Sequence, residues 1–586
     1  MVPDVPAISR RFDYSVPARL ESEVHLGSRV RIELHGRRVG GWVIEDDVGP
    51  TPGVAAKPVA GSSGAGPPPP LMAVAGWAAW RWAGPLSSFL RTASPHRVVR
   101  PGRPSGSGPP AVPAPPSPGG GAVTIVDDAL AAMGATGVVV RLAPALDATL
   151  VVQEVIHRVG VRSVLVLAPS HGRAGQVAAR LREVGIPVAL MPDMWEQASR
   201  GTGVVVGTRA AAFAPTARLA AVVVLDAHDE AYREERAPTW SAVEVAVERA
   251  RRDGAPALLV SACPPLTLTE GRPTVTTVRA VERRGWPVVE VVDRSGDDPR
   301  TGLFSERMVA AVRSALDGPA GPVVCILNRT GRIRLLACTS CGAVARCTRC
   351  GGPVVQPEVR GDLHCRRCGE VRPAVCAECD STRLKSLRVG VTRATEELSA
   401  LTGVDATEVS ASTPPGHVDR SRLVVGTEAA LHRVHRAALV AFLDFDQHLL
   451  APRFAAGEEA LVLMARAARL VGSRDGGGRV LVQTRFPGHE VLMAAQRADP
   501  GLVAVAERQV REELGLPPFG ALALLRGPGA GAYADGLRSV GGIEVSSPDD
   551  DRRLIRAADH RILCDALAAV PRPPDRLRVE VDPTAV

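Results

Sequence analysis

The chain has 586 residues and a formal net charge of +8, from 70 lysines and arginines against 62 aspartates and glutamates. Its length exceeds what one hydrophobic core supports and predicts about three to five domains. A hydrophobic content of 45% argues for folded domains, and the positive charge points to an anionic partner. Residues 1–17 contain no apolar signal core, and no apolar run approaches the roughly 18 residues of a membrane-spanning helix. We therefore expect a cytoplasmic protein without a membrane partner.

The first hundred residues predict a small β-domain followed by a helical segment. Short runs of β-forming residues surround Gly36 within residues 1–60, which is typical of a compact sheet or barrel. Residues 71–92 are apolar and predict a helical segment. Residues 101–121 are so rich in proline and glycine that they predict a flexible or extended linker. Three tryptophans of the helical segment are expected to pack beneath the barrel: Trp77, Trp80 and Trp82.

From about residue 122 onward, apolar strands alternate with amphipathic helices. This pattern predicts parallel sheets that are covered on both faces. It occurs twice, over residues 122–290 and 291–509, with helices expected at 149–159 and 172–185 in the first set. We therefore expect two α/β lobes in tandem, followed by a small α+β domain at 510–586.

Eight of the eleven cysteines lie within residues 338–379, as four Cys-x-x-Cys pairs. One pair can direct two thiolates at one ion, and two pairs complete a tetrahedral site, so the sequence predicts two zinc ions. The alternatives are a disulfide cluster or a redox dithiol. The missing secretory signal argues against disulfides, and four regularly spaced pairs exceed what one redox motif needs. The pairs are Cys338/Cys341, Cys347/Cys350, Cys365/Cys368 and Cys376/Cys379.

The four pairs can be matched around two ions in three ways. The second and third pairs are separated by fourteen residues, close to the usual zinc-ribbon spacing. If these two pairs share one ion, the flanking pairs must share the other. Four thiolates around each ion leave no position for a reacting water molecule, so both ions are expected to be structural.

Five segments spread over nearly the whole chain fit one known family. The zinc region and its flanking residues are the most specific of them. The others are residues 11–14 with 16–17, 443–447, 514–519 and 581–583. Together they resemble the zinc insertion, the FDY-x-x-P, LDADQ and GYPPF segments, and the C-terminal end of the PriA family, superfamily 2 DNA helicases of replication restart.

The resemblance implies an α/β fold with two RecA-like helicase lobes. It also implies that the zinc sites are nested, with the first and fourth cysteine pairs around one ion and the second and third around the other. The implied domains are an N-terminal β-rich DNA-binding domain (1–100), the linker (101–121), lobe 1 (122–290), lobe 2 (291–509) with a zinc-ribbon-like insertion (336–386), and a small C-terminal α+β domain (510–586).

The N-terminal barrel of the family captures the 3′ end of the nascent leading strand. The resemblance therefore implies a DNA-end pocket made by Phe12, Asp13, Gly36 and Lys57. Phe12 can stack on a terminal base, and Asp13 can accept a hydrogen bond from a free 3′-hydroxyl. The alternative is that Phe12 belongs to the core and Asp13 caps a turn. The implied partners are forked DNA with a free 3′ end, primosome or helicase-loading proteins and single-strand-binding protein, in a nucleoid-associated location.

The chain departs from the family at every helicase motif. A P-loop needs Gly-Lys-Ser/Thr, but residues 142–149 read LAPALDAT, and the only lysines are Lys57 and Lys385, neither of which follows a glycine. Asp147 would place a negative charge where a triphosphate should be neutralised. The acidic motif is reduced to Asp226-Ala227-His228-Asp229, without a clear glutamate, and the arginine-finger segment at 466–473 has displaced arginines. Losing three such parts removes most of what phosphoryl transfer relies on, which makes ATP a doubtful ligand.

Three hypotheses follow for the function. The first is a DNA-binding scaffold on a degenerate helicase fold, which recognises stalled or abandoned forks and helps reload the replicative helicase without unwinding DNA. The second is an active 3′–5′ helicase with a non-standard nucleotide site. The third is a zinc-ribbon interaction module without a DNA role.

Overall fold

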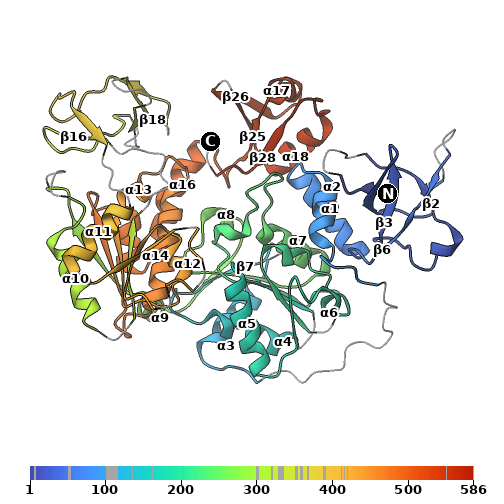
Figure 1. Cartoon of the computed structure of the whole chain (residues 1–586), viewed down its shortest axis with the longest axis horizontal. Coiled ribbons are helices and arrows are strands. Elements are labelled where there is room, and N and C mark those ends of the chain that lie inside the picture. The colour runs from blue at the N-terminus through green and yellow to red at the C-terminus, as the bar shows by residue number, and fades with distance from the viewer. Residues whose placement is uncertain are drawn as a thin grey trace.

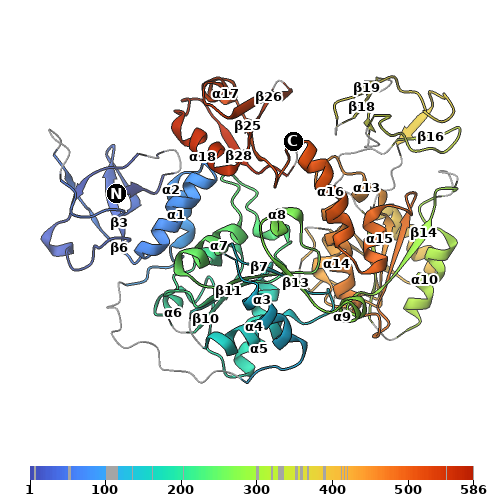
Figure 2. The same ribbon diagram turned by 180° about the vertical axis from the view of Figure 1, so that it is seen from behind.

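The computed structural model arranges two α/β lobes side by side, with three smaller parts along one side of them (Figures 1 and 2). The zinc-insertion region lies over lobe 2, and the C-terminal domain lies between this region and the N-terminal domain (Figure 1). The structure describes residues 1–5, 8, 10–49, 55–100, 116–134, 136–160, 163–201, 203–297, 302–318, 321–327, 336–349, 354–356, 361–365, 368–386, 391–410, 412–414, 416–418, 420–549 and 551–584.

The N-terminal domain is a small antiparallel sheet backed by two helices. Its sheet has the order β1-β4-β3-β6, and β2 pairs with β5 in parallel. Side chains of β3 alternate between buried and exposed, because one face of the strand packs on the domain core. The elements are β1 (Val2–Pro3), β2 (Tyr14–Ser15), η1 (Ala18–Leu20), β3 (Arg29–Leu34), β4 (Arg37–Trp42), β5 (Lys57–Pro58), β6 (Gly61–Gly64), α1 (Pro69–Arg81) and α2 (Leu86–Ala93).

Lobe 1 contains, within the described residues, a sheet of seven parallel strands in the order β13-β7-β12-β11-β8-β10-β9. Successive residues of β8 enter two different apolar cores, one on each face, which explains its uninterrupted apolar sequence. The strands are β7 (Val138–Arg141), β8 (Val164–Leu167), β9 (Val188–Leu190), β10 (Val204–Gly207), β11 (Ala221–Val224), β12 (Ala257–Ser261) and β13 (Thr274–Thr276). The helices are α3 (Gly121–Ala131), α4 (Ala148–Val159), α5 (His171–Glu183), α6 (Trp195–Ser199), η2 (Arg209–Phe213), η3 (Glu230–Tyr232), α7 (Ala242–Asp253), α8 (Leu266–Thr269) and α9 (Arg279–Arg284).

Lobe 2 repeats this plan with six parallel strands, counted over the part of the chain that the structure describes, in the order β14-β24-β23-β15-β22-β21. Separate apolar cores again cover its two faces. The strands are β14 (Val288–Asp293), β15 (Val323–Leu327), β21 (Ala406–Val409), β22 (Leu423–Gly426), β23 (Leu439–Asp444) and β24 (Arg479–Thr484). The helices are α10 (Glu306–Leu316), α11 (Val391–Thr402), α12 (Ala430–Arg433), α13 (Asp446–Leu449), α14 (Ala456–Val471), α15 (Glu490–Arg497) and α16 (Gly501–Glu513).

The zinc-insertion region leaves lobe 2 after β15 and returns to it at α11. It is built from short antiparallel pairings between β16 and β20 and among β17, β18 and β19. Its strands are β16 (Leu336–Cys338), β17 (Val354–Val355), β18 (Leu363–Cys365), β19 (Val371–Arg372) and β20 (Leu384–Ser386).

The C-terminal domain is an antiparallel sheet of order β26-β27-β25-β28, with α17 and α18 packed on one face. Its apolar core is continuous with that of α1, α2 and one face of the lobe 1 sheet. Its elements are β25 (Ala521–Arg526), α17 (Ala530–Arg538), β26 (Ile543–Asp549), β27 (Arg552–Ala557), α18 (His560–Ala569) and β28 (Arg578–Val581).

The predicted fold class is confirmed: two parallel α/β lobes carry a β-rich N-terminal domain, a cysteine-rich insertion and a small α+β domain. Among the described residues, none of the helices is both long and apolar enough to span a membrane.

Candidate functional site

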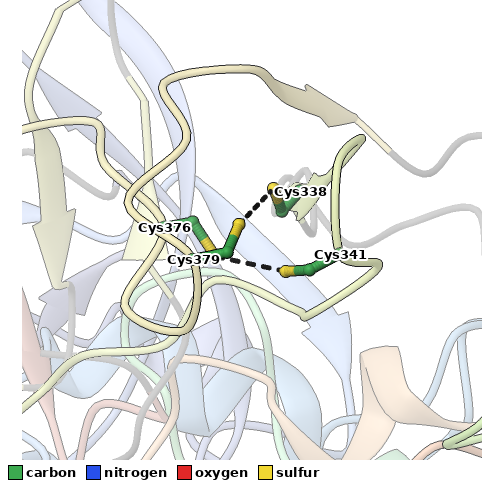
Figure 3. A group of neighbouring side chains, drawn as sticks. All are labelled: Cys338, Cys341, Cys376 and Cys379. Atoms are coloured by element: carbon green, nitrogen blue, oxygen red, sulfur yellow. Dashed lines mark hydrogen bonds between the residues drawn. The ribbon is translucent and has the colours of Figure 1, made fainter.

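The first and fourth cysteine pairs lie together in the zinc-insertion region (Figure 3). Sulfur atoms of Cys338 and Cys379 are 3.6 Å apart, and those of Cys341 and Cys376 are 3.5 Å apart. A zinc ion with Zn–S bonds of about 2.3 Å requires sulfur atoms roughly 3.8 Å apart. The four thiolates therefore fit a tetrahedral zinc ion.

The local backbone explains how these pairs converge. The amide of Gly342, at a φ of 81°, donates to the carbonyl of Cys338 over 2.9 Å, which closes a tight turn behind the first pair. Asp380 closes the corresponding turn behind the fourth pair, with its amide 3.1 Å from the Cys376 carbonyl. Burial opposes ionisation of Cys338, but backbone amides of Cys341 and Ser340 outweigh it and lower the pKa of this thiol to about 6. A thiolate is the form that binds zinc.

A second sulfur group lies in the interior of the insertion. Cys347, Cys365 and Cys368 form a potential metal-binding cluster, and the sulfurs of Cys347 and Cys368 are 3.5 Å apart. The fourth expected ligand, Cys350, lies outside the described residues. Apolar side chains of β16, β17 and β18 surround this group, so a metal here would be sheltered. The first group joins the first and fourth cysteine pairs, and the second joins Cys347 with the third pair, as nested zinc sites require.

A cavity of about 760 Å³ lies between the zinc-insertion region and lobe 2. The guanidinium of Arg346 rests 3.6 Å from the ring centre of Phe486, and Arg485 also lines the cavity together with several hydroxyl groups. Guanidinium groups beside an aromatic face have the chemistry for contacting phosphates and bases.

The four residues expected to bind the DNA end come from the segment before β2, the β3–β4 turn and β5 of the N-terminal domain. Tyr14, next to Phe12 and Asp13, is opposite Lys57 in the β2–β5 pair. The Lys57 ammonium is 2.9 Å from a carboxylate oxygen of Glu33, on β3 directly before the hairpin that contains Gly36. Asp13, Gly36 and Lys57 are exposed, whereas Phe12 is half-buried.

The backbone around this region is specific in two places. His35 and Gly36 have φ values of 47° and 74°, which make the tight β3–β4 hairpin turn. The backbone of Phe12 is bonded in both directions to Met1, over 2.8 and 3.0 Å. Glu33 was not predicted to belong to this site. Its alternation with buried residues on β3 was the signal that it points outward.

The position of the former P-loop is occupied by a carboxylate. Asp147 precedes α4, and its side chain accepts a hydrogen bond from the Thr149 amide over 3.0 Å. Arg180 of α5 pairs with the same carboxylate. Burial opposes ionisation of Asp147, but the bonds from Thr149 and Arg180 lower its pKa. The α4 N-terminus, where a phosphate would bind, thus already holds an anion from the chain.

Ion pairs join the two lobes at the same cleft. Arg469 of α14 binds Asp226 through two hydrogen bonds, one of 2.7 Å, and Arg466 lies 3.0 Å from Asp229. The two arginines are three residues apart and so share one face of α14. Burial opposes ionisation of Asp226, but Arg469 lowers its pKa to about 2. The sequence identified these arginines as displaced and did not predict their new partners.

Little space remains between these groups. A cavity of about 260 Å³ is lined by residues 144–147, Arg173, Arg469, Gly472 and Ser473. This volume is below the roughly 300–1,000 Å³ of typical small-molecule pockets.

Comparisons with known proteins show which family this sequence resembles. Residues 2–95 match the family model described as the PriA 3′ DNA-binding domain (3′BD). The probable replication restart protein PriA of Mycobacterium tuberculosis (strain H37Rv) is 32% identical over 94% of this chain and 88% of its own length. That of Mycobacterium leprae is 31% identical over 88% of this chain and 85% of its own length.

Among solved structures, Saccharomyces cerevisiae Dbp5 bound to RNA and ADP BeF3 is similar at a TM-score of 0.37 and 12% identity, over 67% of this chain and 93% of that one. A Methanococcus jannaschii DEAD box protein has a TM-score of 0.31 and 12% identity, over 64% and 90%.

The matched domain and the two parallel lobes define a DNA-binding protein with an α/β fold. The chain belongs to the family of the replication restart protein PriA. Membership and the 3′ DNA-binding domain assign it a DNA-binding role in replication restart.

Proposed function

We propose that the protein recognises stalled or abandoned replication forks through the 3′ end of the nascent strand and promotes reloading of the replicative helicase without unwinding DNA itself. The observation that carries this proposal is the combination of the matched 3′ DNA-binding domain with a cleft whose charged side chains pair with one another, Asp147 with Arg180 and Asp226 with Arg469. Helicase-loading proteins and single-strand-binding protein are the proposed protein partners.

The proposed DNA-end pocket uses Phe12, Asp13, Gly36 and Lys57. Phe12 is stacked on the terminal base, for about 1–3 kcal/mol, while exposed Asp13 accepts a hydrogen bond from the 3′-hydroxyl. Lys57 must exchange Glu33 for a phosphate. This exchange is cheap because both side chains are about half-exposed, at 58% and 49%. The positive φ of Gly36 keeps the hairpin tight beside the pocket.

Two structural terms oppose nucleotide binding in the cleft. The Asp147 carboxylate, paired with Arg180, already accepts a hydrogen bond from the Thr149 amide at the α4 N-terminus, so a phosphate would have to displace it there. Arg469 already occupies the Asp226 carboxylate that could otherwise hold magnesium. Breaking such a buried pair costs about 3–5 kcal/mol. Asp226 has only 6% of its side chain exposed, so solvent cannot replace the arginine.

The cysteine groups are proposed to hold two structural zinc ions, one bound by Cys338, Cys341, Cys376 and Cys379. The other would be bound by Cys347, Cys350, Cys365 and Cys368. Their role is to fold the insertion, whose Arg346 lines the cavity together with Arg485 of lobe 2.

An ATPase assay with forked DNA tests the absence of turnover. We expect phosphate release equal to that of a blank without enzyme, under conditions where the same protein binds the fork. Replacing residues 147–149 by Gly-Lys-Thr is expected to leave activity at the blank, because the finger and the glutamate remain absent.

The competing function is an active helicase with a non-standard nucleotide site. It requires fork-stimulated hydrolysis by the native chain that disappears in Asp226→Asn. Matched Asp475→Asn, an exposed change on lobe 2, would keep that hydrolysis. Such a result would overturn the proposal.

A further inference from the structure

The C-terminal segment Val581-Asp582 joins three parts of the molecule. Val581 ends β28 and pairs with Ala523 of β25, and Asp582, which follows it, adopts a φ of 54°. Its amide donates to the Leu522 carbonyl over 2.9 Å. Few residues other than glycine adopt this conformation unless surrounding contacts hold it, so the side chain is aimed by the backbone.

The Asp582 carboxylate binds one group from each of two domains. One oxygen is 2.8 Å from Nη2 of Arg81, at the end of α1 in the N-terminal domain. The other oxygen is 2.6 Å from Nε2 of His560, at the start of α18 in the C-terminal domain. Arg81 has only 10% of its side chain exposed, so its charge depends on this partner.

Lobe 1 contacts the backbone carbonyl of Val581, the residue before Asp582. The Val581 oxygen accepts hydrogen bonds from Nη2 of Arg233, over 3.0 Å, and from the Thr239 hydroxyl, over 3.1 Å. Two adjacent residues therefore connect the N-terminal domain, lobe 1 and the C-terminal domain.

Further contacts between α1 and α18 surround this point. The Trp80 indole donates to Asp565 over 2.9 Å, and the Cys564 thiol donates to the Arg81 carbonyl over 3.1 Å. Beside it, rings from α2 and lobe 1 form an aromatic contact, with 6.0 Å between the centres of Phe89 and Phe213. The views in Figures 1 and 2 agree that α1 and α2 lie between the N-terminal sheet and the C-terminal domain.

We infer that Asp582 is a positioning residue that fixes the DNA-end domain relative to the lobes, so that the protein prefers forked DNA over an isolated 3′ end. This inference rests on the proposed function. A fixed spacing makes the second DNA contact effectively intramolecular once the first has formed, which raises affinity without new contacts. A loosened joint loses this gain but keeps the DNA-end pocket, which lies on β2, β3 and β5.

The test compares wild type with Asp582→Asn, using two fluorescent DNAs. One is a fork with a 3′-hydroxyl nascent strand, and the other is a short single strand with the same 3′ end. Small-angle X-ray scattering reports whether the domains stay together. The matched control is Asp535→Asn, an exposed position in the same domain that pairs with Arg538.

We expect Asp582→Asn to bind the single strand like wild type, to lose about tenfold or more in fork affinity, and to show a larger radius of gyration. Asp535→Asn should match wild type in all three. An unchanged fork affinity with a compact particle, or an equal loss for both DNAs, would overturn the inference. If wild type binds DNA equally well with and without a free 3′ end, the proposed function is refuted instead.

If Asp582→Asn does not fold, Trp80→Phe provides the second variant. It replaces the indole that donates a hydrogen bond to Asp565 by a smaller ring that cannot donate one. Trp80→Phe should weaken fork binding less than Asp582→Asn does and leave single-strand binding unchanged. If the variant binds each DNA as tightly as wild type does, the inferred joint is contradicted.

Discussion

Asp226 and Arg469 form an ion pair between the two lobes. The aspartate is buried with a left-handed φ of 52°, and the arginine reaches it from the other lobe. Because both charges are satisfied by each other, neither needs a nucleotide or a metal ion. The pair holds the cleft in one arrangement.

Asp446 on α13 predicts that the protein loses stability as the pH rises. Burial and the neighbouring Asp444 carboxylate raise its pKa to about 7. Between its unfolded pKa near 4 and this value, the folded chain holds a proton that the unfolded chain releases. The free energy of unfolding should therefore fall as pH rises from about 4 to 7, with a slope of at most roughly 1.4 kcal/mol per pH unit from this group.

Asp446→Asn should remove this contribution. The amide oxygen can still accept from the Arg485 amide, which lies 3.1 Å from the carboxylate. Urea unfolding at pH 5, 6 and 7 should show a shallower decline for the variant, while Asp475→Asn, an exposed change on the same lobe, should follow wild type. Parallel curves for Asp446→Asn and wild type would contradict the assigned protonation.

At the residue scale, the sequence shows directly which motif residues are missing, but it does not reveal the partners of distant residues. The loss of lysine at the P-loop could be read directly. Nothing local indicated that Arg469 would reach Asp226, because 243 positions separate them. Of the three tryptophans, Trp82 is buried and stacks edge-on with Trp77, but Trp80 donates to Asp565, a contact set by docking of two domains.

The zinc-insertion region is the element whose composition was most informative. Its four cysteine pairs allow three arrangements around two ions, and both the spacing and the sulfur distances favour the nested one. The zinc ions proposed for the two cysteine groups would supply folding energy that its short strands and small apolar core lack.

Serine variants test the ligand sets. Wild type should contain two zinc ions per chain by mass spectrometry. Cys338→Ser and Cys376→Ser should lose the same ion in site-resolved anomalous scattering, and Cys347→Ser and Cys365→Ser the other. Cys325→Ser, in buried β15 of lobe 2, should keep both. Density placing Cys338/Cys341 with Cys347/Cys350 around one ion would contradict the nesting.

At the scale of the whole molecule, strand–helix alternation was enough to predict two parallel lobes. The inner strands of both lobes are continuously apolar because their successive residues enter two different cores. How the N-terminal and C-terminal domains dock could not be predicted. Their interface depends on Arg81 and Asp582, which lie 501 positions apart, and no local pattern encodes such a contact.

Recognition of the 3′-hydroxyl is the claim on which the functional account depends. Asp13 should accept a hydrogen bond from a free hydroxyl, whereas a terminal phosphate would bring negative charge against this carboxylate and abolish the bond. Asp46→Ala is a matched control, because Asp46 is also exposed in the N-terminal domain and lies outside the proposed pocket.

The most direct measurement is the affinity for forks that differ only in ending with a 3′-hydroxyl or a 3′-phosphate. Wild type and Asp46→Ala should prefer the hydroxyl end, and Asp13→Ala should stay folded and lose that preference. Equal affinity of wild type for both ends would contradict the proposed 3′-end recognition.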